Sequence, residues 1–529
     1  MKKIVPVILT LALFLGVFSF HVSAQDTQYR QLSLEDFQNK VAGGWAGKMI
    51  GVSYGAPTEF RALGTTYEKP LAWEPDHVNN SIFQDDMYVQ MSFMMTMDEY
   101  GMDAPAEKFA ETFATAGYQL WCANVQARKN FFDGIMPPMS GNPKYSLWAD
   151  AIDFQIEADY IGFMCPGMPQ TSNKICDKIG HIMNYGDGVY GGMFVCALYT
   201  EAFFEKDMNK IVNNALLAIP AESEYAQCVQ DVIDLHAKYP DDWRAAWKVL
   251  DEKWGDTDIS GPLDAFNIDA KINGAYIVMG LLYGDGDFGK TMQVSIRCGQ
   301  DSDCNPSNAA AVLGIRDGYS NIPDKWKGGI PAIADSVFVF TEYSFNKVVD
   351  KTVEYAKKLI SENGGTVGDD VVQVKIQAPV APAELEVSFP NLKPLYRSET
   401  TDDAWTWKGP WETLTVNNPK TQFVGKLKTA KKKGAEAIFK FKGTGVMISG
   451  AWSKDYGKAD VYIDGKLDRT IDAYYWVANV GNPGAFLYHN VTLADGDHEI
   501  RIVLKGEKNL KSTDTNFTIA GAVVYGPKN

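Results

Sequence analysis

The sequence predicts a multidomain protein in which an all-α bundle is followed by a small all-β sandwich. Before Asp370, apolar residues recur at helical spacing and strand-like alternation is scarce. The proline-containing segment 377–382 is typical of an extended linker. After it, short alternating segments and Asp-Gly turns predict strands. These observations divide the chain into an all-α domain at residues 25–370, a linker at 371–394 and a β-sandwich at 395–529.

Composition and charge narrow the classes of partner. The chain has 529 residues, of which 12% are aromatic and 22% charged, as is typical of a globular protein with two or more domains. Its formal net charge of −16 argues against nucleic acid as a partner. Small molecules, cations and neutral glycans remain as candidate partners. The oligomeric state stays open. The cysteines lack any Cys-x-x-Cys pair, which indicates neither a zinc site nor a complete disulfide framework.

The first 24 residues have the pattern of a secretory signal peptide. Lys2 and Lys3 form a basic end, residues 4–20 form an apolar core, and residues 22–24 form a small-residue cleavage site. Cleavage after Ala24 would leave a soluble periplasmic or secreted protein. No other apolar run is long enough to span a bilayer, so we expect no membrane insertion.

A glycine-striped helix is predicted at the start of the all-α domain. The helical pattern begins at residue 34, and glycines then recur every four residues, at Gly43, Gly47, Gly51 and Gly55. On a helix they form one smooth stripe that lets another element come very close. Glu59 follows this stripe, after Pro57, either as a functional carboxylate or as an ordinary first-turn acid.

Two acidic residues begin the next predicted helix. Asp85 and Asp86 follow Gln84 and precede a strongly apolar run. Helix capping alone would explain the two acids. The methionines of this run favour core packing over a metal site, because methionine is a flexible packer.

The glycine-rich stretch at residues 180–193 lies between predicted helices. Its glycines, Gly188 and Gly191 among them, suggest that the backbone approaches something closely. Asp187 either contacts a ligand or makes a turn, and Tyr190 follows three residues later.

A polar turn with two acids precedes an alanine-rich helix near residue 307. Asp301 and Asp303 lie two residues apart in this turn, where Asn305 is expected to cap the helix and Pro306 to fit its first turn. Two carboxylates on a short, rigid loop are suitable oxygen ligands for a hard cation such as Mg²⁺. The alternative is that they only solubilise the turn.

The region after the linker predicts a β-sandwich similar to jelly-roll or galactose-binding-like domains. Residues 499–504 alternate between apolar and polar, and Asp-Gly pairs at 464–465 and 495–496 indicate hairpin turns. The region is rich in aromatic residues, which would form either a carbohydrate-binding platform or the core: Trp405, Trp407, Trp411, Trp452, Tyr474, Tyr475 and Trp476.

Residues 36–319 resemble the ADP-ribosylglycohydrolase family, which includes the dinitrogenase-reductase-activating glycohydrolases. Three motifs carry the resemblance, in the family's order. The glycine stripe ends in Gly-Ala-Pro-Thr-Glu59, an Asp-Asp pair follows at 85–86, and Gly-Gln-Asp301-Ser-Asp303 is similar to the family's Gly-Gly-Asp-x-Asp-Thr. The resemblance implies an all-α bundle with two Mg²⁺ ions, or Mn²⁺, in a central cleft.

The resemblance also implies a set of metal ligands. These are Asp85, Asp86, Asp301 and Asp303, and Gln84 adds an amide oxygen where the family usually has Thr or Ser. Cys304 stands where the family usually has Thr, and sulfur is a poor ligand for a hard ion. The number of bound ions, one or two, therefore remains open. Without cations, four clustered carboxylates would repel one another strongly.

Carried over from the family, Glu59 and Asp303 would be catalytic. Asp187, Gly188, Tyr190 and Gly191 lie where the family has a glycine-rich substrate loop and, with Asn305, would contact substrate. Divalent ions would hold the vicinal hydroxyls of the sugar and orient water for attack at C1, and Glu59 would assist proton transfer.

Three functions follow from this resemblance. The first is binuclear-metal hydrolysis of an O- or N-glycosidic bond to a ribosyl-like furanose in an exported glycan or glycoconjugate, which the signal peptide and the β-sandwich favour. The second is hydrolysis of ADP-ribose from a protein or a small molecule. The third, of another class, is a sugar- or nucleotide-binding protein without catalysis. It remains possible because Gln84 and Cys304 depart from the residues that the family usually has.

Overall fold

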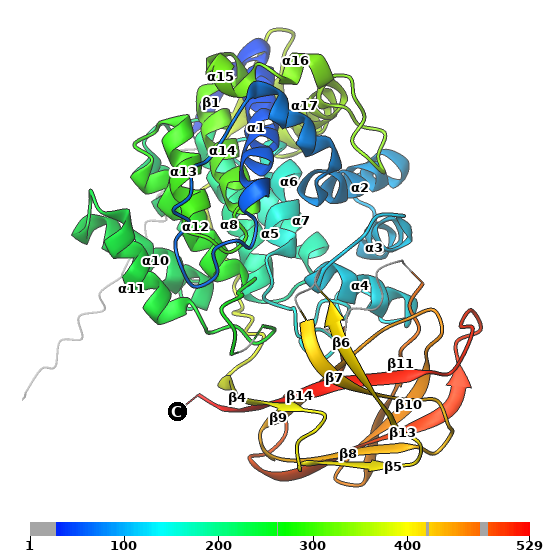
Figure 1. Cartoon of the computed structure of the whole chain (residues 1–529). Helices are drawn as coiled ribbons and strands as arrows, with labels where there is room; N and C mark the ends of the chain where they lie inside the picture. The colour runs from blue at the N-terminus through cyan, green and yellow to red at the C-terminus, as the bar shows by residue number, and fades with distance from the viewer. Residues whose placement is uncertain (1–27, 262, 419–422, 477–484, 529) are drawn as a thin grey trace, which may run out of the picture.

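The computed structural model describes residues 28–261, 263–418, 423–476 and 485–528. A helical domain is followed by a domain of strands, and Figure 1 shows the two packed against each other. The predicted order of an all-α bundle and an all-β sandwich is confirmed. The predicted signal peptide, residues 1–24, lies outside the described residues. Among the described helices, none has the length and apolar character needed to cross a membrane.

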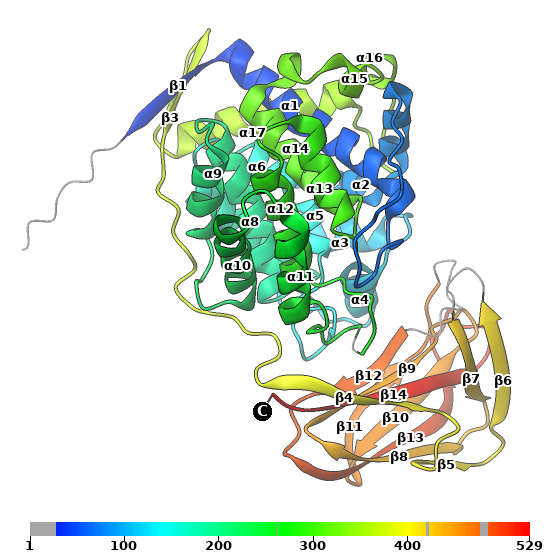
Figure 2. The ribbon, with the colours of Figure 1, turned by 60° about the vertical axis from the view of Figure 1, so that its left-hand side comes forward.

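The helical domain is organised around α1 (Leu34–Gly55) and α14 (Cys304–Asp317), which lie side by side in Figures 1 and 2. The glycine stripe faces α14 along the length of α1. A Cβ atom on Gly47 would lie 2.3 Å from the carbonyl oxygen of Ala310, and one on Gly55 would lie 2.1 Å from that of Ser302. The predicted close approach is therefore confirmed, and it brings the end of α1 against the turn that precedes α14.

The other helices surround this pair. Two of them lie in the core, because every residue of α12 and all but one residue of α8 are buried. The remaining helices and 3-10 turns are η1 (Ala56–Thr58), η2 (Pro75–Phe83), α2 (Asp85–Tyr100), α3 (Ala106–Thr115), α4 (Cys122–Phe132), α5 (Asp153–Glu157), α6 (Asp159–Phe163), α7 (Pro169–Gly180), α8 (Asp187–Ala202), α9 (Met208–Leu216), α10 (Glu224–Lys238), α11 (Trp243–Trp254), α12 (Ala270–Tyr283), α13 (Phe288–Arg297), η3 (Tyr319–Asn321), α15 (Asp324–Lys327), α16 (Ile330–Ile333) and α17 (Phe345–Glu362).

A small antiparallel sheet closes the helical domain. Its order is β1 (Tyr29–Ser33), β3 (Val371–Lys375) and β2 (Thr366–Val367). Residues 371–375, which the sequence placed in the linker, therefore form a strand of the helical domain. The physical reason is that Val372 and Val374 are fully buried and alternate with more exposed neighbours. The chain then runs along the helical domain to β4 (Leu392–Glu399), as Figure 2 shows.

The second domain is a sandwich of two antiparallel sheets. One sheet has the order β11-β10-β13-β8-β5, and the other has the order β12-β9-β14-β7-β6 with β4 paired to β14. The strands are β5 (Trp405–Lys408), β6 (Glu412–Asn418), β7 (Phe423–Ala430), β8 (Glu436–Gly443), β9 (Gly445–Gly450), β10 (Gly457–Ile463), β11 (Lys466–Asp472), β12 (Ala485–Asn490), β13 (Gly496–Lys508) and β14 (Phe517–Pro527).

One of the two predicted hairpins is present and the other is not. Asp464 and Gly465 both have positive φ, of 51° and 79°, and join the paired strands β10 and β11. The Asp495–Gly496 pair does not join paired strands, because β12 and β13 belong to different sheets. This turn carries the chain from one sheet to the other.

The aromatic residues of the sandwich contribute largely to its core. Trp405, Trp452 and Tyr475 are buried, and the ring of Trp405 stacks 4.7 Å from that of Phe439. Core packing therefore accounts for these three. Carbohydrate binding by the partly exposed aromatic residues stays a prediction.

Candidate metal centre

The structure brings three predicted acidic segments to the same place. Glu59 follows η1 at the end of α1, Asp86 lies in the first turn of α2, and Asp301 and Asp303 lie in the turn before α14. Their carboxylates come together because the glycine stripe lets α1 and α14 pack closely.

The turn before α14 is held to the segment after Glu59 by backbone hydrogen bonds. The Gln300 amide donates to the carbonyl of Ala62 at 2.9 Å, and the Phe60 amide donates to the carbonyl of Gln300 at 3.1 Å. Gln300 adopts a φ of 54°, which is unusual for a residue with a side chain. These contacts fix the positions of Asp301 and Asp303 relative to Glu59.

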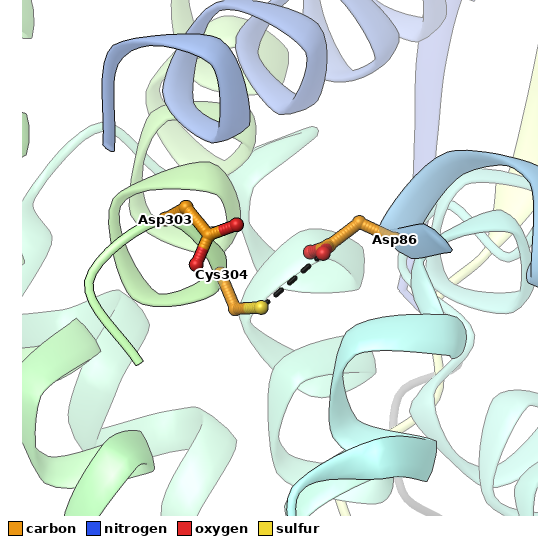
Figure 3. A group of neighbouring side chains, drawn as sticks. All are labelled: Asp86, Asp303 and Cys304. Carbon is orange, nitrogen blue, oxygen red and sulfur yellow. Dashed lines mark hydrogen bonds between the residues drawn. The ribbon is translucent and has the colours of Figure 1, made fainter. Parts of the chain in front are cut away.

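The acidic side chains form two overlapping groups that share Asp303. In each group the candidate ligand atoms lie within 4.8 Å of one another. The first group, called here the open half, contains Glu59, Asp301 and Asp303. The second group, called here the lysine half because Lys48 pairs with Asp86, contains Asp86, Asp303 and Cys304 (Figure 3).

The open half has the properties of a cation site. Asp301 Oδ1 and Asp303 Oδ1 are buried, and neither has a hydrogen-bond partner among the described residues. An ionised oxygen in this position is costly unless a cation or donor satisfies it. Burial, followed by the charge of Glu59, raises the pKa of Asp301 to about 8. Burial and then the charge of Asp301 raise the pKa of Asp303 well above its usual range. The donor set therefore fits a hard divalent ion.

Glu59 is the accessible member of the open half. The residue is exposed overall, but its carboxyl group faces the buried acids. Burial of that group and the charges of Asp303 and Asp85 raise its pKa to about 8. A carboxyl group that titrates near neutral pH and contacts solvent is suited to proton transfer.

The charge of Asp86 in the lysine half is partly balanced from within the protein. Cys304 Sγ donates to Asp86 Oδ2 at 3.2 Å (Figure 3), and Lys48 Nζ lies 3.2 Å from Asp86 Oδ1. Lys48 is completely buried and also pairs with Asp159 at 2.9 Å. Although burial alone would lower the pKa of Lys48, the charges of Asp159 and Asp86 raise it. Both oxygens of Asp86 thus already have donors.

Gln84 and Asp85 lie next to the centre. Gln84 is the N-cap residue of α2, but its side chain makes no capping hydrogen bond. Asp85 belongs to neither of the two acidic groups, yet burial and the charge of Asp86 raise its pKa to about 7. Their roles as metal ligands stay predictions.

Asn305 does not have its expected position as the cap of α14. Helix α14 already begins at Cys304, with Asp303 in the N-cap position, so the expected capping by Asn305 is wrong. Its Nδ2 instead donates to Asn273 Oδ1 at 2.9 Å, and the same oxygen accepts from the Asp301 amide at 3.3 Å. Asn273, from α12, therefore helps to position the acidic turn. A contact between Asn305 and substrate stays a prediction.

The residues of the predicted substrate loop lie at the start of α8 and outside the two acidic groups. A Cβ atom on Gly188 would lie 2.4 Å from the carbonyl oxygen of Ala149, and one on Gly191 would lie 2.7 Å from Gln155 Oε1. The Tyr190 hydroxyl accepts a hydrogen bond from the Glu386 amide at 2.7 Å. The backbone at these glycines therefore closely approaches other parts of the protein. Contact between this segment and substrate stays a prediction.

Asp187 lines a polar pocket of about 270 Å³ that is separate from the two acidic groups. Asp150, Asp269 and Lys271 also line this pocket, and Lys271 Nζ lies 2.6 Å from Asp269 Oδ2. Burial raises the pKa of Asp187 to about 7, against the opposing effect of Lys271. We refer to these four residues as the Asp187 pocket.

Sequence reasoning missed Lys48, Asp159 and Asn273. Each lies on a helix whose local sequence has no metal-site motif. The available signal was Lys48 itself, which is a charged residue in the otherwise apolar and glycine-rich middle of α1. In such a helix a lysine needs a buried partner, and Asp86 was a candidate for that partner.

Comparisons with known proteins give one family match and similarities to individual proteins. The model of the ADP-ribosylglycohydrolase family matches residues 33–360. One curated relative is the "A type blood alpha-D-galactosamine galactosaminidase" of Flavonifractor plautii, which is 31% identical over 114 residues. The match covers 21% of this chain and 10% of that protein, so the chain spans about a tenth of the relative's length.

Two solved structures are similar to parts of the chain. An ADP-ribosylglycohydrolase-related protein complex has 12% identity and a TM-score of 0.42, with 61% of this chain and 99% of that chain covered. The CBM36-1 domain of a multidomain xylanase from the hindgut metagenome of Trinervitermes trinervoides has 18% identity and a TM-score of 0.18, with 25% and 98% covered. Because both TM-scores are low, these likenesses imply nothing about the ligands of this chain.

Proposed function

The chain belongs to the ADP-ribosylglycohydrolase family, and on that basis we propose that it is a divalent-metal-dependent hydrolase of glycosidic bonds. The observation that carries the proposal is the open half, where buried oxygens of Asp301 and Asp303 have no donor in the described part of the chain and lie beside an accessible Glu59. The proposed substrate is a ribosyl-like furanose in an exported glycan or glycoconjugate.

Each side chain of the centre has a proposed role. Asp301 and Asp303, with Asp85, Asp86 and Gln84 as further candidates, would hold Mg²⁺ or Mn²⁺. When bound, the metal supplies positive charge that positions sugar hydroxyls and water. Glu59 takes a proton from the water that attacks C1 and returns one to the leaving oxygen or nitrogen. The bond from C1 to the leaving group breaks as the bond to the water oxygen forms.

Several features favour a glycan over an ADP-ribosyl substrate. The predicted signal peptide would export the chain, and the name of the curated relative is that of a galactosaminidase. The net charge of −16 also disfavours a diphosphate ligand. Hydrolysis of ADP-ribosyl bonds is the second candidate, which the family description favours.

The first experiment is thermal melting of the mature chain after chelation, followed by titration with Mg²⁺ and then Mn²⁺. A ligand that binds only the native state raises its melting temperature by mass action. We expect a saturable rise. No response to either ion would contradict metal dependence.

The second experiment identifies the bond that is cleaved. The metal-loaded chain is incubated with aryl furanosides, including ribofuranosides, and separately with ADP-ribosylated arginine and serine peptides. Release from the furanosides alone would support the glycan proposal, whereas release from the peptides alone would support the second candidate. Metal binding without any turnover would favour a binding protein. The Asp303→Asn variant is the control for each substrate.

A further inference from the structure

We propose that the ammonium group of Lys48 takes the place of a second metal ion, so that the centre holds a single divalent ion in the open half. The proposal rests on the metal dependence proposed above but not on the identity of the substrate. It goes against the two ions that the family resemblance implies.

Lys48 is fixed beside Asp86 by all three of its N–H donors. Its Nζ lies 3.2 Å from Asp86 Oδ1, 2.9 Å from Asp159 Oδ2 and 2.9 Å from the carbonyl oxygen of Ile156. The backbone of α1 is held at the same point, because Ser307 Oγ donates to the Lys48 carbonyl at 3.0 Å. The positive charge therefore cannot move away without breaking several buried contacts.

Asp159 anchors this lysine and is itself fully engaged. Its Oδ1 accepts from the Tyr199 hydroxyl at 2.5 Å and from Asn308 Nδ2 at 2.9 Å. Its Oδ2 accepts from Gln90 Nε2 at 3.1 Å in addition to pairing with Lys48. Asp159 is thus positioned to hold Lys48 and has little capacity left for an ion.

The two halves of the centre differ in what they offer an ion. In the open half, Asp301 Oδ1 and Asp303 Oδ1 are buried, and no described residue donates to them. In the lysine half, Lys48 and Cys304 each occupy one oxygen of Asp86. An ion bound to Asp86 would lie within a few ångströms of the Lys48 ammonium, where like charges repel. Cys304 also offers sulfur where a hard ion prefers oxygen.

The metal content of the full mature chain tests the proposal directly. The chain is stripped with a chelator, loaded with Mn²⁺ and measured by elemental analysis and by calorimetric titration. We expect one ion per chain and an EPR spectrum of isolated Mn²⁺. Two ions per chain, or a spectrum of exchange-coupled ions, would overturn the proposal.

Variants of Lys48 show which residue excludes the second ion. Lys48→Met removes the charge at similar length and leaves Asp86 and Asp159 without a cation, so we expect two ions per chain. Lys48→Arg keeps the charge, and we expect one ion. A Lys48→Met variant that folds and still binds one ion would contradict the proposal.

A third variant keeps the test decisive if Lys48→Met does not fold. Cys304→Thr restores the hydroxyl that the family usually has here and leaves Lys48 in place, so we expect one ion. A second ion in Cys304→Thr would assign the exclusion to the thiol and overturn the role of Lys48. Binding of no ion by the unaltered chain would defeat the proposed function as a whole, whereas binding of two ions would defeat only the role of Lys48.

Discussion

The metal centre and the Asp187 pocket are both clusters of buried acids, but their charges are arranged differently. In the Asp187 pocket, Lys271 lies 2.6 Å from Asp269 and 3.6 Å from Glu224, so a lysine neutralises part of the cluster. In the open half of the metal centre, one oxygen each of Asp301 and Asp303 has no donor within the ranges that the structure describes. The difference teaches that a density of buried acids does not identify a metal site. The metal centre is distinguished by clustered acids, of which Asp301 and Asp303 each have an oxygen without a hydrogen-bond partner among the described residues.

The largest expected difference between the two clusters concerns turnover. Asp303→Asn should remove about 4 kcal/mol of transition-state stabilisation, on the order of a 10³-fold loss of kcat/KM, because a metal ligand is weakened. In chelator its melting temperature should equal or exceed that of the unaltered chain, because the variant removes one of several crowded buried acids. Kinetics with the identified substrate and thermal melting check the two effects. Full activity in Asp303→Asn would remove this aspartate from the centre.

Loss of Lys271 from the Asp187 pocket should lower the stability of the folded chain. Lys271→Met leaves Asp269 and its buried neighbours without a cation, which should cost about 3–5 kcal/mol of the free energy of unfolding. Metal affinity should stay unchanged, because Lys271 is not part of the metal centre. Denaturant unfolding checks the cost, with Lys271→Arg as the matched control. Equal stability of the two variants would mean that the pocket does not depend on its positive charge.

The effect of metal on the pH dependence of stability should differ between the two clusters. The folded-state pKa values of Asp301 and Asp85 are raised to about 8 and about 7, above the value of about 3.9 for an unfolded aspartate. These groups bind protons more tightly in the folded chain. Their contribution is therefore complete below about pH 4 and is lost as pH rises toward 8.

The measurement is thermal melting from pH 5 to pH 8 with chelator and with saturating Mn²⁺. With chelator, the melting temperature should fall across this range. With metal, the fall should be smaller, since the bound ion favours ionised carboxylates. Asp187, whose pKa is raised to about 7, contributes a fall under both conditions. Parallel curves in the two conditions would show that the ion does not bind at these acids.

The smallest expected effect is that of Asp187→Asn. The residue lies in the separate pocket, so we expect unchanged metal affinity. If the predicted substrate contact is made, KM should rise less than about tenfold, a cost below about 1.4 kcal/mol, with kcat unchanged. Steady-state kinetics and metal titration of this variant provide the check. A drop in kcat as large as that of Asp303→Asn would mean that the two clusters work as one.

The parts of this structure that local sequence patterns determine were predictable. Helical spacing predicted the all-α domain, and the glycine stripe predicted the close packing of α1, which a Cβ atom on Gly47 would prevent. The motifs around Glu59, Asp86 and Asp303 predicted acids that the fold brings together. Each of these follows from residues near one another in the chain.

The features that depend on distant partners were not predictable in this way. Lys48, Asp159 and Asn273 come from three different helices, and only the packed fold shows what they contact. Similarly, only the arrangement of the two sheets shows that the turn at 495–496 connects strands of different sheets. The pairing of β3 with β1 likewise joins segments at opposite ends of the helical domain's sequence.

That pairing has a consequence for how the chain is made. Strand β1 is among the first segments of the helical domain to be synthesised, and its partner β3 ends at Lys375. The domain therefore cannot complete its sheet until synthesis has passed Lys375, and contacts of such long sequence separation form slowly. Until then the edge of β1 that pairs with β3 is open, and other strands can add to it. A chain terminated at residue 370 would keep that edge permanently, so a self-contained helical domain should extend at least through Lys375.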